Sequence, residues 1–340
     1  MNVSSVASPP AIAAARELVD APMRAAVDAL DPRMRLIAAY QMGWVEADGT
    51  PRATAGGKAV RPTLAVLSAR AAGAAPRVGV PGAVAVELVH NFSLLHDDVM
   101  DRDVERRHRP TGWAVYGDGQ AILAGNAMLI AAIEAVQQSG PHASAAVSTL
   151  LEATQRLITG QAEDLAYEKR TDLTVDDVLG MEAGKTAALL SCSASIGAVL
   201  AGAAPETVAA LAEYGEQLGM AFQLVDDVLG IEGDPAVTGK SASADLRVGK
   251  RSAPVVAALS AGTTAADDLA AVLAGGPPDT DAEVARAAQL LRAAGGVEWA
   301  EAEARTRLGR ALAALDRGPL EPTARVELEQ VARFVVGRDH

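Results

Sequence analysis

The stretch "GAVAVELVHNFSLLHDDVMD", residues 82–101, begins as an apolar run and ends on aspartates. Its apolar residues recur three and four positions apart, which predicts a helix with a buried face. On that helix Asp97 and Asp101 lie one turn apart on one face, with Asp98 about 100° around. Like charges so close repel one another unless a cation lies between them. Acidic groups are also common at solvated helix ends, so this stretch alone leaves both interpretations open.

A second stretch, "MAFQLVDDVLGIEGDP" at residues 220–235, repeats the pattern. It is again an apolar helix that ends in adjacent aspartates, Asp226 and Asp227, with Gln223 one turn earlier on their face. Two aspartate-tipped helices in an otherwise apolar chain predict facing walls of one metal site. Mg²⁺ suits such a site because it prefers oxygen ligands and is often held by carboxylates plus substrate phosphates.

Basic groups suited to anions surround these two stretches, in "GGKAVRP", "ERRHRP", "GKT" and "TGK". Arginine can bind a phosphate through two parallel hydrogen bonds, whereas lysine acts as a point charge. Together with the aspartates they predict a diphosphate held through Mg²⁺. The bundle interior beneath it, lined by alanine and leucine, would accept an apolar tail.

Composition indicates one large helical domain or two small ones. The 340 residues are 50% hydrophobic but only 3% aromatic, and the net charge of −13 argues against a nucleic-acid surface. The single Cys192 excludes an internal disulfide and fits a cytosolic setting. The opening residues lack the basic and apolar regions of a signal peptide, and we find no convincing membrane span. We therefore expect a soluble, cytoplasmic protein.

Helical periodicity recurs along the whole chain, and nothing predicts a sheet. We expect a flexible tail over residues 1–10 and one all-α domain over 11–340, with breaks at glycine- and proline-rich clusters such as "AGGPPDTD". The predicted helices lie near residues 11–45, 60–74, 80–103, 119–138, 142–168, 174–202, 205–230, 251–260, 265–274, 281–294, 296–316 and 322–336.

Seven ordered motifs make the chain resemble the trans-prenyl diphosphate synthases, also called polyprenyl synthetases. They are "GGKAVRP", "ELVHNFSLLHDDVMD", "RRHRPTG", "ILAGNAML", "GQAEDL", "GKTAAL" and "FQLVDDVLGIEGDPAVTGKSASADLRVGKRSAP". The resemblance implies an all-helical bundle around a deep central cavity, the isoprenoid synthase type I fold, usually paired as a homodimer. It implies Mg²⁺-dependent ionisation of an allylic diphosphate, condensation with isopentenyl diphosphate, and proton elimination.

For the metal site, the resemblance implies that Asp97, Asp101 and Asp226 are Mg²⁺ ligands bridging the allylic diphosphate, with Asp98 and Asp227 in support. We expect three Mg²⁺ ions with substrate bound, and Mn²⁺ as a possible substitute. Further residues similar to those that line this site in the family are Gln161, Asp164 and Asp245.

For the substrates, the resemblance implies two pockets and a reaction centre. Arg106, Lys185 and Lys240 resemble the clamp on the allylic diphosphate, and Thr186 and Gln223 would lie near the developing carbocation. The residues that resemble the family's pocket for isopentenyl diphosphate are Lys58, Arg61, His90 and Arg107, aided by Arg338. Lys250 and Gln161 are further substrate-binding candidates.

Three positions depart from the family pattern. Gly230 stands where many members carry a third aspartate, Asn126 where an aspartate is commoner, and His108 where glycine follows the arginine pair. The glycine at position 230 predicts an active enzyme with weaker Mg²⁺ binding. We have no functional account of Asn126.

The resemblance assigns control of product length to two positions before the first aspartate motif. Ser93 lies one turn below Asp97 on nearly the same face, while Phe92 points aside. Phenylalanine followed by a small residue at these positions resembles the pattern of family members that make twenty-carbon products. We therefore expect geranylgeranyl diphosphate as the product, with farnesyl diphosphate as the alternative.

Two other classes of function remain open. A class I terpene cyclase would use the same aspartates but has no need of "GGKAVRP" and usually lines its cavity with aromatic residues, which are scarce here. An inactive regulatory subunit would be expected to have lost ligands of the first aspartate motif, and this chain retains them. A phosphohydrolase of the histidine–aspartate type would need more histidines than this chain supplies around His96.

Overall fold

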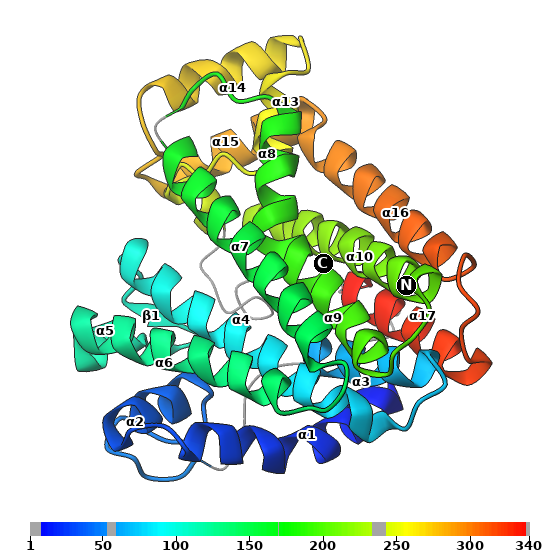
Figure 1. The fold of residues 1–340 in the computed structure, drawn as a ribbon. Helices are drawn as coiled ribbons and strands as arrows, with labels where there is room; N and C mark the ends of the chain where they lie inside the picture. The colour runs from blue at the N-terminus through cyan, green and yellow to red at the C-terminus, as the bar shows by residue number, and fades with distance from the viewer. Residues whose placement is uncertain (1–7, 53–58, 169, 233–242, 338–340) are drawn as a thin grey trace.

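The computed structural model describes residues 8–52, 59–168, 170–232 and 243–337, and these residues are arranged as a bundle of helices (Figure 1). The all-α fold class predicted from the periodicity is confirmed. Residues 1–7 of the expected N-terminal tail lie outside the described residues, and the first helix begins at Pro10. The elements are α1 (Pro10–Asp28), α2 (Pro32–Gln41), α3 (Val60–Ala71), η1 (Pro76–Gly79), α4 (Val80–Met100), β1 (Glu105–Arg106), β2 (Arg109–Pro110), α5 (Gly112–Tyr116), α6 (Asp118–Gln137), α7 (Ala143–Tyr167), α8 (Val175–Glu182), η2 (Ala183–Ala187), α9 (Ala188–Leu200), α10 (Pro205–Glu232), α12 (Ala244–Arg247), α13 (Ala253–Leu259), α14 (Thr264–Ala274), α15 (Asp281–Ala293), α16 (Gly296–Ala314) and α17 (Pro322–Val336).

Two of the predicted helices are divided in the structure. The segment 11–45 breaks before α2, where the Asp31 carboxylate accepts a hydrogen bond of 3.0 Å from the Arg33 N–H and Pro32 takes the first helical position. Both residues favour a helix start, because the carboxylate satisfies an unpaired N–H group and proline needs no donor there. The segment 174–202 contains the π-helical turn η2 between α8 and α9. Single π-turns inside helices are frequent at functional sites.

The prediction that no sheet forms was wrong for one short hairpin. Strands β1 and β2 pair antiparallel, with Arg106 opposite Arg109. The two turn residues, Arg107 and His108, have φ values of 53° and 59°. Positive φ at both central positions is the geometry of a tight hairpin turn, and it favours glycine, so His108 adopts a conformation that L-residues rarely take. Strands of two residues carry no periodic signal, which is why the sequence did not reveal them.

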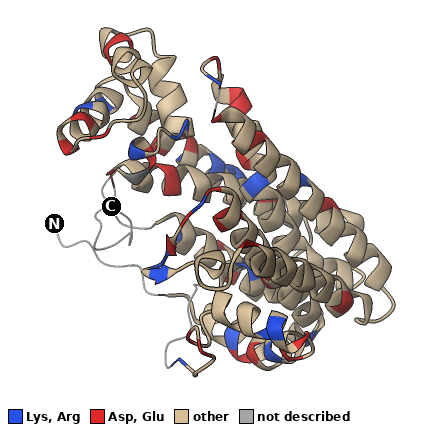
Figure 2. Ribbon diagram, turned by 90° about the vertical axis from the view of Figure 1, so that its left-hand side faces the viewer, with Lys and Arg blue, Asp and Glu red and all other residues tan. Residues whose placement is uncertain are grey.

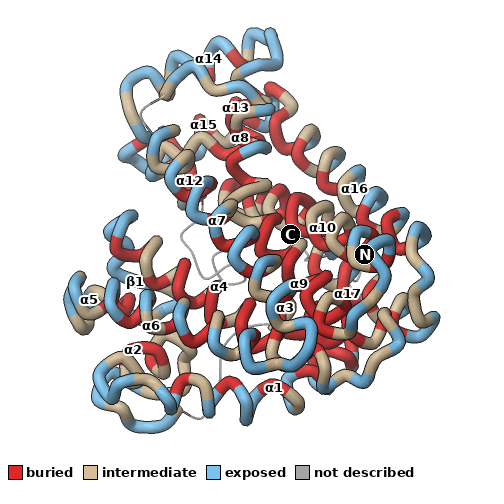
Figure 3. Tube along the Cα trace, viewed as in Figure 1, coloured by how far each residue is buried: buried red, intermediate tan, exposed pale blue. Residues whose placement is uncertain are grey.

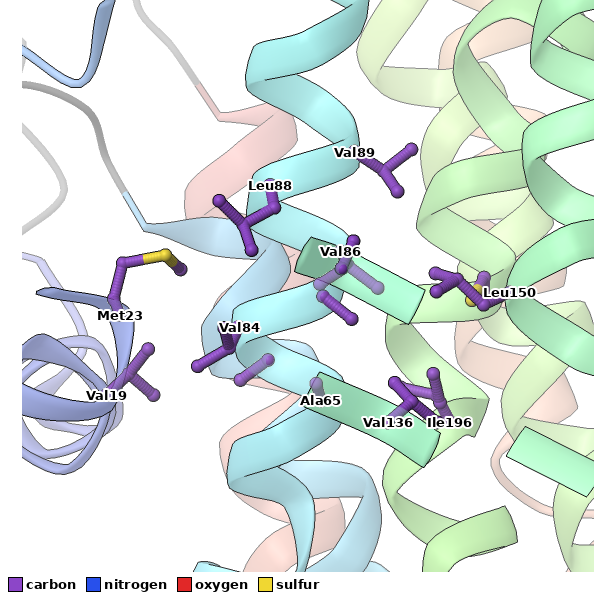
Figure 4. Close-up of a cluster of buried hydrophobic side chains, with 14 of the residues drawn as sticks. Val19, Met23, Ala65, Val84, Val86, Leu88, Val89, Val136, Leu150 and Ile196 are labelled. Atoms are coloured by element: carbon purple, nitrogen blue, oxygen red, sulfur yellow. The ribbon is translucent and has the colours of Figure 1, made fainter. Parts of the chain in front are cut away.

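The core lies between helices that are distant in sequence. Buried residues run along α3, α4, α9 and α10, whereas α14 is mostly exposed (Figure 3). A hydrophobic cluster from α1, α2, α3, α4, α6, α7 and α9, including Val86, Leu150 and Ile196, packs around the part of α4 from Val80 to Phe92 (Figure 4). At the α3–α9 contact a Cβ atom on Gly197 would lie 2.1 Å from the Ala65 carbonyl oxygen, so these two helices can pack this closely only with glycine there.

Three helical stretches of the described residues meet the length and composition of a membrane span: Pro76–Met100, Asp118–Gln137 and Val175–Leu200. The expectation that no stretch would do so was wrong by this criterion. The first and third are 72% and 67% buried inside the bundle over their most apolar window, so their apolar character belongs to the core. The second, α6, is only 39% buried. Ile122, Leu123 and Ile130 of this helix are exposed, whereas Met128 and Val136 are buried.

Candidate functional site

The C-terminal end of α4 carries the first aspartate motif. The helix stops at its C-cap, Asp101, whose N–H donates to the Asp97 carbonyl oxygen across 2.8 Å, so the two residues lie one turn apart as predicted. Asp97 is half-buried and Asp101 exposed, whereas Asp98 turns into the protein and is 1% exposed. Figure 2 marks the positions of the charged residues along the ribbon. Asp97 and Asp101 thus lie one turn apart with Asp98 turned away from them, as the helix geometry predicted.

Burial and mutual repulsion make this end of α4 suitable for a cation. Burial raises the pKa of the Asp97 carboxyl to about 6, with Asp101 and Asp98 adding to the rise while Lys185 and Arg106 oppose it. Burial also raises the pKa of Asp101, again against the effect of Lys185. A divalent cation would remove this penalty, because it stabilises the charged form. The oxygen donors present fit Mg²⁺.

No group of three His, Cys, Asp or Glu side chains within the four described ranges could hold a metal ion by itself. A cation bound at Asp97 and Asp101 would therefore need further oxygen ligands. Diphosphate oxygens supply such ligands in Mg²⁺ sites that use only one or two carboxylates. The donor set thus fits Mg²⁺ bound together with its substrate.

Arg106, predicted to bind the allylic diphosphate, is tied to the first motif. Its Nε donates to Asp98 Oδ1 across 2.7 Å, and its side chain remains 31% exposed. The contact fixes the β1–β2 hairpin against the end of α4. Arg107, the next residue, is exposed in the turn of that hairpin.

Lys185 reaches the same region from η2. It forms an ion pair with Asp164 of α7, and its charge also acts on Asp97 and Asp101. The approach depends on Gly160, since a Cβ atom there would lie 2.3 Å from the Lys185 backbone nitrogen. The motifs "GQAEDL" and "GKTAAL" therefore meet because glycine allows α7 and η2 to come into backbone contact.

The second aspartate motif forms a polar chain with η2. Thr186 Oγ1 donates to Gln223 Oε1 across 2.7 Å, and Gln223 Nε2 donates to Asp227 Oδ1 across 2.8 Å. The other carboxylate oxygen of Asp227 accepts a longer bond of 3.3 Å from the Ala253 N–H. Asp227 is 2% exposed, whereas its neighbour Asp226 is half-buried. The two adjacent aspartates thus differ, with Asp227 held inside the wall of the site.

Three residues predicted for the second diphosphate pocket lie within electrostatic range of one another. Burial lowers the pKa of His90 well below its usual value, and the positive charges of Arg61 and Arg107 lower it further. His90 is consequently a neutral imidazole beside two guanidinium groups. The predicted Lys58, Lys240 and Arg338 lie outside the described residues.

Gly230 and Asp245 explain one departure from the family pattern. A Cβ atom on Gly230 would lie 2.4 Å from Asp245 Oδ2, so the carboxylate of α12 occupies the space beside the missing side chain. Asp245 is 8% exposed, and Lys250 Nζ lies 4.0 Å from it. Burial alone would lower the pKa of Lys250, but Asp227, Asp245, Asp164 and Glu182 outweigh this effect and raise it. Lys250 is therefore a charged group facing four acids.

The remaining predicted residues occupy the walls around these groups. Gln161 is 5% exposed, and both polar atoms of its amide lack a hydrogen-bond partner among the described residues. Phe92 packs edge-to-face on His96, with 4.9 Å between ring centroids, and the buried Ser93 hydroxyl donates to the His90 carbonyl oxygen. Asn126 is exposed on α6, and the structure offers no contact that explains its departure.

Sequence reasoning missed three residues of the site, Met181, Glu182 and Ser252. All three line a small cavity of about 40 Å³ together with Asp164, Lys185, Thr186, Gln223 and Lys250. A larger pocket of about 490 Å³ lies at the ends of α7, α9 and α10, away from these groups, and its lining includes His142 and Val208. A lone acid in the apolar run "VLGMEAG" was the only signal for Glu182, and it belongs to no spacing pattern.

The sequence profile of the polyprenyl synthetase family matches residues 45–291. A (2E,6E)-farnesyl diphosphate synthase of Mycobacterium tuberculosis (strain ATCC 25618 / H37Rv) is 46% identical over 333 residues, covering 97% of this chain and 93% of the relative. A geranylgeranyl diphosphate synthase of the same strain is 43% identical over 292 residues, covering 85% and 83%.

Solved structures agree with the fold. A polyprenyl synthetase from Streptomyces coelicolor A3(2) superposes with a TM-score of 0.92 at 49% identity, covering 96% of this chain and 98% of that one. A polyprenyl synthase from Caulobacter crescentus CB15, complexed with calcium and isoprenyl diphosphate, gives a TM-score of 0.84 at 28% identity over 99% of both chains. With two aspartate-bearing helices beside basic groups in the order of the family motifs, the chain belongs to the polyprenyl synthetase family and is a prenyltransferase of the short-chain trans-prenyl diphosphate synthase type.

Proposed function

We propose that the protein is a farnesyl diphosphate synthase, which condenses isopentenyl diphosphate head-to-tail with allylic diphosphates and stops mainly at fifteen carbons. The observation that carries this product is the 46% identity, over 97% of the chain, to a (2E,6E)-farnesyl diphosphate synthase. The comparisons support this alternative better than the geranylgeranyl product that the sequence pattern favoured. Geranylgeranyl diphosphate is the second candidate product, because the buried Ser93 next to Phe92 is small and leaves room for a longer chain.

The site residues divide the work between two diphosphates. Asp97, Asp101 and Asp226 hold Mg²⁺ when it is bound, and the metal supplies positive charge to the leaving oxygens of the allylic diphosphate. Lys185 adds a positive charge from the opposite wall. Its pairing with Asp164 holds the ammonium group in place before substrate arrives.

Isopentenyl diphosphate is bound by the basic group around His90. Arg61 and Arg107 supply charge-assisted hydrogen bonds, and the neutral His90 can donate one more without adding charge. Lys58 and Arg338 are also proposed to bind isopentenyl diphosphate.

The reacting carbons lie beside the polar chain of Thr186 and Gln223. The carbonyl end of the Gln223 amide and the hydroxyl of Thr186 present negative dipole ends to the developing carbocation. The π bond of isopentenyl diphosphate attacks this cation, and the released diphosphate takes the proton that is eliminated. Buried apolar residues below Asp97 exclude the water that would quench the cation.

The exposed apolar side chains of α6 and α7 form the interface of a homodimer in this proposal. Five of the nine exposed large hydrophobic residues among the described residues lie on these two neighbouring helices, namely Ile122, Leu123, Ile130, Leu151 and Ile158. A contiguous apolar face of this kind marks an interaction surface, and a second copy would cover it.

The cellular setting of the proposal follows the family. We place residues 11–340 in one domain and the enzyme in the cytoplasm, where its single buried Cys192 needs no oxidising environment.

Incubation of the purified protein with isopentenyl diphosphate, Mg²⁺ and dimethylallyl, geranyl or farnesyl diphosphate tests the function, with products measured by mass spectrometry. We expect farnesyl diphosphate from the first two primers and little extension of the third. Efficient extension of farnesyl diphosphate would assign the enzyme to geranylgeranyl diphosphate instead. A cyclic hydrocarbon formed without isopentenyl diphosphate would support a terpene cyclase, and absence of any product would support a regulatory subunit.

A further inference from the structure

The β1–β2 hairpin carries two arginines of the proposed site but has little structure of its own. Arg106 on β1 is expected to bind the allylic diphosphate, and Arg107 in the turn is expected to bind isopentenyl diphosphate. Each strand has two residues, and φ is positive at both turn residues, 53° at Arg107 and 59° at His108. A hairpin this short is marginal in water by itself, and residues other than glycine rarely adopt such φ values. Its position must therefore come from contacts with the rest of the protein.

Contacts within residues 103–113 close the base of the hairpin. The Thr111 N–H donates to the Val104 carbonyl oxygen across 3.1 Å. The Asp103 carbonyl oxygen accepts from the Thr111 hydroxyl at 2.7 Å and from the Trp113 indole N–H at 2.8 Å. Both partners of each bond lie in the same short segment, so these bonds shape the hairpin but do not fix it against the helices.

Arg109, on β2, joins the hairpin to the end of α2. Its Nη1 donates to the Tyr40 carbonyl oxygen across 3.2 Å, and its Nη2 donates to the Val45 carbonyl oxygen across 3.0 Å. Its guanidinium carbon also lies 4.1 Å from the centroid of the Tyr40 ring. The Tyr40 hydroxyl in turn donates to the Pro110 carbonyl oxygen across 2.6 Å. Two neighbouring residues of β2 are therefore bound to Tyr40, which is 4% exposed.

The acceptors of Arg109 are held in place by the backbone around them. The Trp44 N–H donates to the Ala39 carbonyl oxygen across 2.9 Å, which ties the loop after α2 to that helix. Val45 pairs with Pro51 in an isolated antiparallel bridge, so its carbonyl oxygen lies in a closed turn. Arg109 is thus bound to a fixed surface, and its planar fork of N–H donors satisfies two carbonyl oxygens at once.

The hairpin is held from two sides. Arg106 and Arg109 lie directly opposite each other on the two strands, and like charges in this arrangement repel. Each has its own partner on a different helix. Asp98 of α4 accepts from Arg106 at 2.7 Å, and Tyr40 of α2 binds Arg109. Loss of the Arg109 contacts would leave the arginine pair on a hairpin that is held at one strand only.

We propose that Arg109 is a positioning residue that fixes the β1–β2 hairpin on Tyr40 and the Val45 carbonyl group and thereby places Arg106 and Arg107 for the two diphosphates. This inference rests on the proposed function, because that function assigns the diphosphates to Arg106 and Arg107. The guanidinium group of Arg109 is already used by the Tyr40 ring and two carbonyl oxygens. Arg109 therefore acts through the hairpin and not on a substrate.

Arg109→Lys tests the role by keeping the charge and removing the fork. The lysine can still pair with Glu46, which lies 3.9 Å from Arg109 Nη2, but it cannot donate to both carbonyl oxygens and lie flat on the Tyr40 ring. We expect KM for isopentenyl diphosphate and KM for the allylic primer each to rise about tenfold, with kcat changed by less than about threefold. A merely less stable fold would instead lower the apparent kcat and leave both KM values unchanged, because the remaining folded enzyme binds normally.

A second variant and a matched control accompany it. Tyr40→Phe keeps the ring under Arg109 and loses only the hydroxyl bond to Pro110, so we expect both KM values to rise about threefold. Arg24→Lys is the control, because Arg24 also stacks on an aromatic ring, that of Trp44 at 4.5 Å, and pairs with Asp20 on its own helix. It should leave both KM values unchanged. A rise in only one KM value for Arg109→Lys, or a fall in kcat alone, would overturn the inference.

Hydrogen–deuterium exchange tests the position of the hairpin without catalysis. In Arg109→Lys we expect amide exchange over residues 104–111 to become at least about fivefold faster, with exchange in α16 unchanged, because a hairpin without its anchor opens more often. Exchange over these residues equal to that of the parent would overturn the inference.

Double variants separate this inference from the proposed function. In the Arg107→Ala background, Arg109→Lys should raise KM for isopentenyl diphosphate little further while still raising KM for the allylic primer, because only Arg106 is left to be misplaced. Effects on KM for isopentenyl diphosphate that multiply would overturn the inference. If neither Arg106→Ala nor Arg107→Ala changes a KM value, or if the parent forms no prenyl product, the proposed function fails. The exchange measurement then decides by itself whether Arg109 fixes the hairpin.

Discussion

Arg106 Nε donates a hydrogen bond of 2.7 Å to Asp98 Oδ1, and this pair joins the β1–β2 hairpin to the last turn of α4. Asp98 is 1% exposed, and its other carboxylate oxygen has no hydrogen-bond partner among the described residues. Arg106 is therefore the group that compensates a buried negative charge. The same guanidinium group is expected to bind the allylic diphosphate, so the position of the β1–β2 hairpin affects how Arg106 can bind this substrate.

Replacing Arg106 by alanine should lower the free energy of unfolding by about 2–3 kcal/mol, because it leaves the Asp98 charge buried and uncompensated. The value lies below that of a fully buried pair, since Arg106 is 31% exposed. Urea denaturation at pH 7 measures it. Arg102→Ala is the control, because Arg102 pairs with Asp118 on the surface at 2.7 Å with 62% and 45% exposure, and its loss should cost less than about 1 kcal/mol. Equal losses in the two variants would contradict the assignment.

Removing a proposed metal ligand should act mainly on turnover. We expect Asp97→Ala, Asp101→Ala or Asp226→Ala to lower kcat at least about a hundredfold, equivalent to roughly 2.7 kcal/mol of barrier, because each carboxylate helps to hold the charge that stabilises the leaving diphosphate. Steady-state assays at saturating Mg²⁺ provide the measurement. The control is Asp268→Asn, an exposed surface acid. Turnover close to that of the parent in Asp97→Ala would remove Asp97 from the metal site.

The raised pKa of Asp97, about 6 in the folded protein against a usual 3.8, predicts a pH-dependent stability of the metal-free enzyme. Between these pH values the Asp97 carboxyl has lost its proton in the unfolded chain but keeps it in the folded protein. The contribution of Asp97 to the free energy of unfolding is therefore fully present below pH 4 and is lost as the pH rises through 6. The loss is at most about 3 kcal/mol. Urea unfolding in EDTA from pH 4 to pH 7 should show it, and Asp97→Asn should flatten the curve. Mg²⁺ should stabilise the parent more at pH 7 than at pH 5, because its ligands must be ionised. Parallel curves for the parent and Asp97→Asn would show that Asp97 does not carry the effect.

The basic group around His90 should distinguish the two substrates. Arg61→Ala should raise KM for isopentenyl diphosphate about tenfold or more and leave KM for the allylic primer nearly unchanged, since one charge-assisted contact contributes about 1.5–3 kcal/mol. Initial-rate measurements with each substrate varied in turn give the two constants. Arg77→Ala, on η1, is the control. If both constants rise equally, Arg61 does not belong to a separate pocket.

Product length should respond to the two residues before Asp97. Phe92→Ala enlarges a buried wall position and should shift products to longer chains, whereas Ser93→Phe fills the wall and should shift them to shorter ones. Each added isoprene unit buries about five carbons, worth roughly 4 kcal/mol, so only a steric stop that exceeds this attraction ends elongation. Mass spectrometry of the products from geranyl diphosphate is the measurement. If both active variants keep the parent's product distribution, the stop lies on another helix.

The sequence by itself determined the helical class and the positions of the two aspartate motifs. Apolar spacing along α4 and α10 is a local property, and the geometry of one helix is enough to place Asp97 and Asp101 one turn apart. Cavity-lining residues such as Lys185 and Gln223 could also be named, because their motifs occur in the order of a known family.

Tertiary structure alone decided which of these groups touch. Lys185 meets Asp164 because Gly160 lets two helices approach to backbone contact, and Asp245 fills the space beside Gly230 from another element. Neither contact follows from spacing along one helix. Glu182 shows the limit most clearly: a single acid in an apolar helix forms no pattern, and only the packing of α8 on α10 brings its charge within electrostatic range of Asp227. Burial and pairing arise from the packing of distant segments, so the charge state and contacts of the site are properties of the folded protein.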